Sequence, residues 1–134
     1  MLYGESISII MPAYNAEKTI TRAIESIQRQ TYRNWQLIIV NDGSNDTTQE
    51  IIEKKCREDD RIEGYLIENS GPACARNYAM EHAKGKWIAF CDADDWFVSD
   101  ALDTMITAVR GNLSQFGVCY YTTDFDSDIV LCWN

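Results

Sequence analysis

The chain has 134 residues, of which 46% are hydrophobic and 25% charged, and its formal net charge at pH 7 is -9. This length suits one domain with its own core, and the acidic charge excludes a protein that holds nucleic acid on a basic face. No apolar run approaches the roughly 20 residues that cross a bilayer, and the first residues lack the basic start of a signal peptide. We therefore expect one globular domain without a membrane span.

Short β-branched apolar runs alternate with helical patterns along the chain. The first runs predict strands at residues 7–11, 35–40 and 62–67, and a fourth strand begins at Trp87 and ends before Asp92. Between and after them, apolar residues spaced i, i+3, i+4 predict helices at residues 15–30, 46–58, 72–84 and 99–111. Residues 118–123 and 129–133 are expected to form two further strands.

Several residues are expected to set the ends of these elements. Pro12 should stop the first strand because it cannot donate to a strand ladder. Asn15 is expected to cap the first helix, and Asp46 with Gln49 three residues later resembles a capping box. Gly85 is expected to end the third helix as the residue that follows its C-cap.

Four alternations of strand and helix predict right-handed βαβ units. The expected fold is therefore α/β and Rossmann-like, a three-layer sandwich with a mostly parallel central sheet and helices on both faces. The chain stops on an apolar strand, so we expect it to be truncated at its C-terminus relative to a larger protein.

Five cysteines lie far apart with no C-x-x-C pair, at Cys56, Cys74, Cys91, Cys119 and Cys132. This spacing predicts neither a disulfide framework nor a zinc site, so we expect small buried thiols in a reducing cytoplasm. The only histidine, His82, falls within a predicted helix and is expected to be structural.

Three carboxylates, Asp92, Asp94 and Asp95, follow the fourth predicted strand within four positions. Such charges repel one another unless a cation lies among them, and hard oxygen ligands suit Mg²⁺ or Mn²⁺. The alternative interpretation is a solvated acidic turn that caps the next helix.

In an open α/β sheet, ligands bind beyond the carboxyl ends of the strands, where the strand order reverses. Polar turns fall at this edge after each of the four predicted strands, at residues 12–15, at 42–44, at Asn69 and at 92–95. Neither G-x-G-x-x-G nor G-x-x-x-x-G-K-[ST] is present, so bound phosphates need another neutraliser, such as a metal on Asp92 and Asp94. Tyr14 offers an aromatic face for a base.

Two more residues are candidates for contact with a nucleotide. Asp42 can accept an imide N–H from a base. Arg76, in the helix after the third strand, is a candidate contact to the base or diphosphate, and its alternative interpretation is a solvated arginine.

These motifs resemble the family 2 glycosyltransferases with the GT-A fold. The resemblance rests on segments in the same order and at ordinary spacing, over about residues 6–110: residues 9–15, 39–44, Gly71 with 75–77, 83–85 and 90–95. Several coupled motifs make it more specific than a lone D-x-D.

The resemblance implies sugar transfer from a nucleotide diphosphate donor, most often a UDP-sugar, with Mg²⁺ or Mn²⁺. It implies a metal on Asp94 and Asp92, with Asp92 meeting the ribose or the metal shell. The implied nucleotide-sugar contacts are Pro12, Ala13, Tyr14, Asp42, Gly43, Asn69, Arg76, Asp92 and Ala93. The whole chain, 1–134, is then a nucleotide-sugar-binding domain in the cytoplasm, or peripheral at the inner face of the membrane, acting on an acceptor glycan or lipid-linked sugar.

The catalytic base of the family lies well downstream of D-x-D, in the acceptor-binding half that this chain is expected to lack. Asp124, Asp126 and Asp128 are the only carboxylates that follow the predicted helix at residues 99–111, and they are more typical of a turn between strands. Two alternatives stay open. One is a non-catalytic nucleotide-binding module, and the other is an aspartyl phosphotransfer or phosphatase domain, against which the first strand counts because it ends in Pro12-Ala13-Tyr14.

Overall fold

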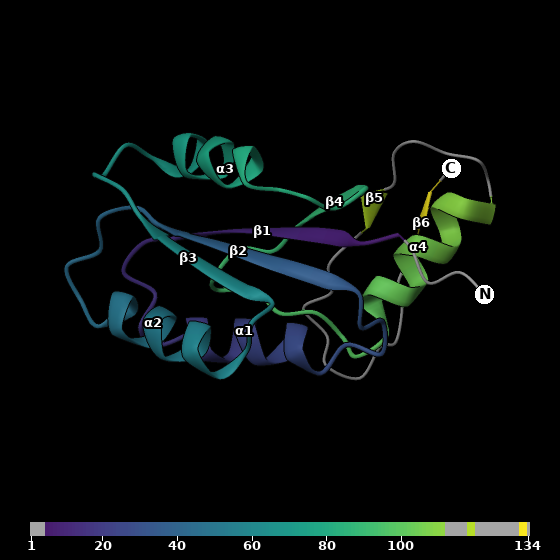
Figure 1. Cartoon of the computed structure of the whole chain (residues 1–134), viewed down its shortest axis with the longest axis horizontal. Coiled ribbons are helices and arrows are strands. Elements are labelled where there is room, and N and C mark those ends of the chain that lie inside the picture. The colour runs from purple at the N-terminus through teal and green to yellow at the C-terminus, as the bar shows by residue number, and fades with distance from the viewer. Residues whose placement is uncertain (1–4, 112–117, 120–131, 134) are drawn as a thin grey trace.

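The computed structural model describes residues 5–111, 118–119 and 132–133, and Figure 1 shows how the elements succeed one another. In chain order the elements are β1 (Ile7–Ala13), α1 (Ile20–Gln28), β2 (Trp35–Asn41), α2 (Thr48–Glu58), β3 (Ile62–Leu66), α3 (Pro72–Glu81), β4 (Trp87–Phe90), α4 (Ala101–Gly111), β5 (Val118–Cys119) and β6 (Cys132–Trp133). No helix in the described part of the chain is long and apolar enough to cross a bilayer.

The first four strands form one parallel sheet in the order β3-β2-β1-β4. At its centre Ile10 of β1 pairs with Ile38 of β2 on one side and with Phe90 of β4 on the other. The chain moves outward from β1 to β3 and then returns to place β4 on the opposite side of β1. The strand order therefore reverses between β1 and β4, which is where ligands bind in sheets of this kind.

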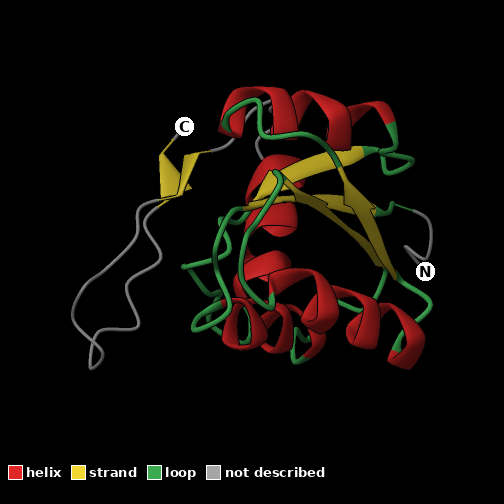
Figure 2. Ribbon diagram, turned by 90° about the vertical axis from the view of Figure 1, so that its left-hand side faces the viewer, coloured by secondary structure: helices red, strands yellow, loops and turns green. Residues whose placement is uncertain are grey.

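Helices cover both faces of this sheet, so the predicted three-layer sandwich is confirmed (Figure 2). Side chains alternate along β1: Ile9 packs with Ile24 of α1 and Leu102 of α4, whereas Ile10 packs in a second cluster that includes Ala79 of α3. Figure 1 shows α3 on one side of the sheet and α1 and α2 on the other. Both faces are therefore buried, as the continuous apolar strands predicted.

The prediction that Pro12 stops the first strand was wrong. β1 runs through Pro12 to Ala13, and Pro12 pairs in register with Val40 of β2. The pairing of β1 with β4 ends at Ile10 and Phe90, so Pro12 has a neighbouring strand on one side only. A residue without an N–H is tolerated at such a one-sided position.

The predicted start of the first helix was also wrong. α1 begins at Ile20 after an N-cap at Thr19, and Asn15 lies in the left-handed region with φ of 47°. Gln49 does not complete a capping box with Asp46, because its side chain contacts Asn41 and Glu53 instead. The carboxylate of Asp46 instead accepts the N–H of Thr48, the first residue of α2.

Gly85 does not serve as the helix terminator that the sequence suggested. α3 ends earlier, with His82 at its C-cap, and Gly85 lies against the start of β1. A Cβ on Gly85 would lie 2.6 Å from the backbone nitrogen of Ser8 and 2.9 Å from the carbonyl oxygen of Ser6. The glycine is therefore required by the close approach of two backbones.

The thiol prediction is confirmed only in part, because Cys91 is buried, Cys56 is half-buried and Cys74 is exposed. His82 stacks on Tyr65, with ring centroids 4.2 Å apart, which agrees with a structural role. β5 and β6 pair antiparallel within the two segments predicted as strands, and the rest of those segments lies outside the described residues.

Replacing Gly85 with alanine is expected to destabilise the fold by about 1–3 kcal/mol, since the added methyl meets backbone atoms that cannot yield without shifting β1. Urea denaturation followed by circular dichroism measures this. Gly111→Ala is the matched control, because nothing lies within 4 Å of a Cβ at that position. Equal urea midpoints for Gly85→Ala and Gly111→Ala would show that the backbone of β1 does not restrict the side chain at position 85.

The carboxylate of Glu5 generates a pH prediction. Hydrogen bonds from Lys86, Trp87 and Arg110 lower its pKa from 4.5 to about 2. A carboxyl group whose pKa is lowered in the folded state stabilises the fold at pH values above its pKa in the unfolded chain. This contribution disappears as the pH falls toward the pKa of the folded state. Glu5→Gln should therefore reduce the free energy of unfolding at pH 7 and lose that deficit progressively between pH 4.5 and about 2.

Urea titrations at several pH values test the effect of Glu5, with exposed Glu68→Gln as the control. A deficit in Glu5→Gln that does not change with pH would contradict the ion-pair explanation.

Candidate functional site

The loops that follow β1 and β2 are fastened to each other by polar contacts. The N–H of Asn15 donates to Ser44 Oγ at 2.9 Å, and the N–H of Asn45 donates to Asn15 Oδ1 at 2.8 Å. Ser44 is held in turn by Asn41, whose Oδ1 accepts the hydroxyl of Ser44 at 2.6 Å. Tyr14 projects from this pair of loops and is 51% exposed, so its ring is available to a ligand.

A second set of contacts joins the same two segments further along. Glu17 accepts the N–H of Thr47 at 3.1 Å, and Asp46 accepts the N–H of Glu17 at 3.2 Å. Burial opposes ionisation of Asp46, but hydrogen bonds from Thr48 and Glu17 hold the pKa of this carboxyl below its usual range. The reciprocal bonds fix the N-terminal side of α2 against the β1–α1 loop.

Asp42, the residue after β2, is buried and anchors the loop between β3 and α3. It is only 4% exposed, and its two carboxylate oxygens accept the N–H of Ser70 at 2.7 Å and of Gly71 at 3.0 Å. The side-chain amide of Asn69 donates to the carbonyl oxygen of Asp42 at 2.9 Å. A carboxylate oxygen has a second lone pair, so Asp42 keeps capacity for one more donor.

Gly43 permits this approach of two loops. Its φ is 71°, and a Cβ there would lie 2.8 Å from the backbone nitrogen of Asn69. The turn predicted at residues 42–44 is confirmed. The structure adds its reason, which is contact with the β3–α3 loop.

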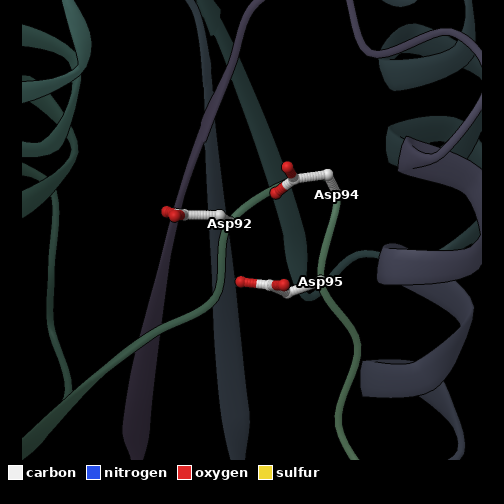
Figure 3. A group of neighbouring side chains, drawn as sticks. All are labelled: Asp92, Asp94 and Asp95. Atoms are coloured by element: carbon white, nitrogen blue, oxygen red, sulfur yellow. The ribbon is translucent and has the colours of Figure 1, made fainter. Parts of the chain in front are cut away.

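The acidic residues after β4 form a compact cluster (Figure 3). One carboxylate oxygen from each of Asp92, Asp94 and Asp95 lies within 4.8 Å of the others, and Asp94 and Asp95 are exposed. The N–H of Asp95 donates to the carbonyl oxygen of Asp92 at 3.0 Å, which closes a tight turn. The fourth strand is therefore followed by three carboxyl groups that lie close together, as the sequence predicted.

The electrostatics of the cluster show that its negative charge is not fully compensated. Burial, followed by the charges of Asp94 and Asp92, raises the pKa of Asp95. Burial, followed by the charges of Asp95, Asp92 and Asp94, raises the pKa of the Cys91 thiol to about 12, so this thiol stays protonated at neutral pH. Hard oxygen donors at this spacing fit Mg²⁺ or Mn²⁺, and Asp92, Asp94 and Asp95 are the groups able to hold such an ion.

Arg76 on α3 reaches the same cluster. Its Nη2 donates to Asp92 Oδ1 at 2.9 Å, with both side chains half-exposed. The guanidinium of Arg76 therefore contacts the acidic turn and is only partly solvated.

Three predicted ligand residues pack into the body of the protein. Pro12 and Ala13 are buried in β1, and Ala93 belongs to the core cluster that contains Leu102 of α4. Tyr14 is thus the exposed side chain that the end of β1 offers to a ligand.

The contacts that hold the loops together cannot be predicted from local sequence patterns. The N-D-G-S sequence at residues 41–44 indicates a turn, but Asn15 and Glu17 lie about 30 residues from their partners, and no local pattern links them. No local pattern indicates the structural role of Asp42 either, which is to accept the N–H groups of Ser70 and Gly71.

Comparison with known proteins places this geometry in a family. The family model "Glycosyl transferase family 2" matches residues 8–128. The chain is 42% identical over 117 residues to the putative teichuronic acid biosynthesis glycosyltransferase TuaG of Bacillus subtilis, covering 87% of this chain and 46% of that protein. It is 41% identical over 114 residues to the Escherichia coli glucosyltransferase WfgD, covering 82% and 43%.

Solved structures agree with this comparison. S. aureus TarS 1-349 in complex with UDP-GlcNAc superposes with a TM-score of 0.74 at 31% identity, covering 79% of this chain and 31% of that one. A mannosyltransferase from Pyrobaculum calidifontis in complex with GDP-Man and Mn²⁺ gives a TM-score of 0.66 at 27% identity, covering 81% and 32%.

The chain spans between 16% and 46% of the length of the curated relatives that it matches. Its α/β fold, with a four-stranded parallel sheet, is the GT-A fold of these glycosyltransferases. The chain belongs to glycosyl transferase family 2.

Proposed function

We propose that this chain is the donor-binding domain of a glycosyltransferase that uses a nucleotide-diphosphate sugar, most simply a UDP-sugar, with Mg²⁺ or Mn²⁺. The observation that carries the proposal is the closeness of Asp92, Asp94 and Asp95 beyond the end of β4, with Arg76 in contact with Asp92. Support for the donor class comes from the relatives, since TarS is found with UDP-GlcNAc and WfgD is named as a UDP-Glc enzyme.

In this proposal the base lies at the ends of β1 and β2. Tyr14 stacks on the base through its exposed ring, beside the buried Pro12 and Ala13. Asp42 accepts an imide N–H with a lone pair that its bonds to the backbone leave free, and Gly43 and Asn69 shape the turn beside it.

The diphosphate lies at the end of β4. Asp94 is the proposed metal ligand, Asp92 meets the ribose or the metal shell, and Ala93 lies between them. A divalent ion held there supplies Lewis acid stabilisation of the charge that builds on the departing phosphate. Arg76 is placed to add a second positive charge to the diphosphate, since its guanidinium already contacts Asp92.

Transfer itself is proposed to be inverting, with a carboxylate that deprotonates an acceptor hydroxyl as it attacks the anomeric carbon. The acceptor is proposed to be a glycan or a lipid-linked sugar, since WfgD is named for a diphosphoundecaprenol acceptor and TuaG for teichuronic acid biosynthesis. We propose that the protein works in the cytoplasm, or at the inner face of the membrane when the acceptor is lipid-linked. Asp124, Asp126 and Asp128 lie outside the described residues, and no base is assigned to them.

Asp94→Asn is expected to weaken binding of UDP in the presence of Mn²⁺ by about tenfold or more, because an amide is a poorer ligand for a hard cation than a carboxylate. Calorimetric titration of the chain with UDP and Mn²⁺ measures this effect. Asp60→Asn, at an exposed turn between α2 and β3, removes the same charge outside the acidic cluster and is the control. UDP binding that needs no metal, or that is unchanged in Asp94→Asn, would contradict the proposal.

Tyr14→Ala is expected to weaken UDP binding by roughly 1–3 kcal/mol, the usual contribution of a base stacked on an aromatic ring. Tyr14→Phe keeps the ring and should bind as the wild type does. Calorimetry with UDP at saturating Mn²⁺ compares the three proteins. Equal affinities in Tyr14→Ala and the wild type would place the base elsewhere.

Turnover of a UDP-sugar separates an enzyme from a binding module. Hydrolysis of a UDP-sugar, or its transfer to an acceptor, supports the glycosyltransferase. Donor binding without turnover in the chain extended to the full length of its relatives would favour a non-catalytic nucleotide-binding module.

A further inference from the structure

Arg76 and Asp92 bind each other in the structure, although the proposed function gives each of them a different partner. Arg76 is assigned to the diphosphate and Asp92 to the ribose or the metal shell. An ion pair joins Arg76 Nη2 to Asp92 Oδ1 at 2.9 Å. Binding of the donor and the metal must therefore change the surroundings of this ion pair.

The position of the pair within the acidic cluster makes it a competitor for the metal. One oxygen of Asp92 lies within 4.8 Å of oxygens of Asp94 and Asp95, so a guanidinium on Asp92 lies beside the space where a divalent cation would bind. Two cations at such short range repel each other, and Arg76 also occupies one of the lone pairs of Asp92.

The ion pair is open enough to exchange partners. The side chain of Arg76 is 36% exposed and that of Asp92 is 44% exposed. A half-exposed ion pair contributes little net free energy, so a stronger anion can replace the carboxylate. A diphosphate is such an anion, because it offers several charged oxygens to the fork of N–H donors on arginine.

We propose that Arg76 is a positioning residue that makes metal binding depend on the nucleotide. Without a nucleotide, Arg76 neutralises Asp92 and keeps the acidic cluster weak for Mn²⁺ or Mg²⁺. The arriving diphosphate takes over the guanidinium of Arg76, which frees Asp92 and lets the cluster bind the metal together with the phosphate oxygens. The inference rests on the proposed function, because it needs both the metal site and the diphosphate site.

The exchange has a thermodynamic consequence. If the nucleotide strengthens metal binding by some factor, the metal strengthens nucleotide binding by the same factor. Arg76 contributes to this coupling because it opposes the metal only while the nucleotide is absent. Removal of its charge should therefore strengthen binding of the metal alone and reduce the coupling.

The test measures Mn²⁺ binding to the 134-residue chain without nucleotide and at saturating UDP, through the electron paramagnetic resonance signal of free Mn²⁺. Arg76→Gln is expected to bind Mn²⁺ alone about fivefold or more tightly than the wild type, and to show a coupling to UDP smaller by about the same factor. Arg76→Lys keeps the positive charge and should stay close to the wild type. Circular dichroism checks that each variant is folded.

Arg29→Gln is the matched control, since it removes the same charge from an exposed arginine that pairs with Glu25 on α1. It should leave the affinity for Mn²⁺ unchanged. Equal strengthening by Arg29→Gln and Arg76→Gln would mean that net charge alone acts, and would overturn the inference.

Two other results separate this inference from the function on which it rests. If the wild type binds Mn²⁺ with UDP but Arg76→Gln binds Mn²⁺ alone no more tightly, the exchange is refuted and the metal site stands. If the wild type binds no Mn²⁺ even with UDP, the proposed metal-dependent donor site is refuted and the exchange with it.

Discussion

The buried carboxylate of Asp42 is the contact on which the ligand edge depends. It accepts the backbone N–H groups of Ser70 and Gly71 and thereby holds the β3–α3 loop against the end of β2. An unpaired charge buried to this extent would be costly, so the two loops are constrained to stay together. α3 follows directly from Gly71 and carries Arg76 to the acidic turn. One carboxylate thus links the proposed base pocket to the proposed diphosphate site.

The layered fold could be predicted because its cause is local. Apolar runs of strand length and helical stripes identified all four strands of the main sheet and the four helices, and the parallel direction of the strands placed their carboxyl ends at one edge. The errors arose where distant contacts decide local structure. Asn15 adopts φ of 47° because its N–H meets Ser44, and Gly85 is small because Ser8 lies against it. No pattern within ten residues of either position contains that information.

The chemical groups of the candidate site could be predicted from the sequence, but the hydrogen bonds and ion pairs between them could not. Three carboxylates after an apolar strand indicated a metal site, and the structure brings Asp92, Asp94 and Asp95 together. Burial, followed by the charges of Asp94 and Asp92, raises the pKa of Asp95, and Arg76 compensates part of the negative charge at Asp92. The sequence did not show that Asp42 already serves two backbone donors or that Arg76 already has an anionic partner. Both facts change which contacts Asp42 and Arg76 can make with a nucleotide-sugar.

The central claim is that the carboxyl ends of β1, β2 and β4 together form one nucleotide-sugar site. A crystal structure of the chain with UDP and Mn²⁺ tests it most directly. The account predicts a uracil ring on Tyr14 within hydrogen-bond distance of Asp42, and Mn²⁺ bridging the diphosphate to Asp94 at about 2.0–2.2 Å, the usual distance for small hard cations on oxygen. UDP bound elsewhere, or at this edge with its diphosphate away from the acidic turn, would contradict the account.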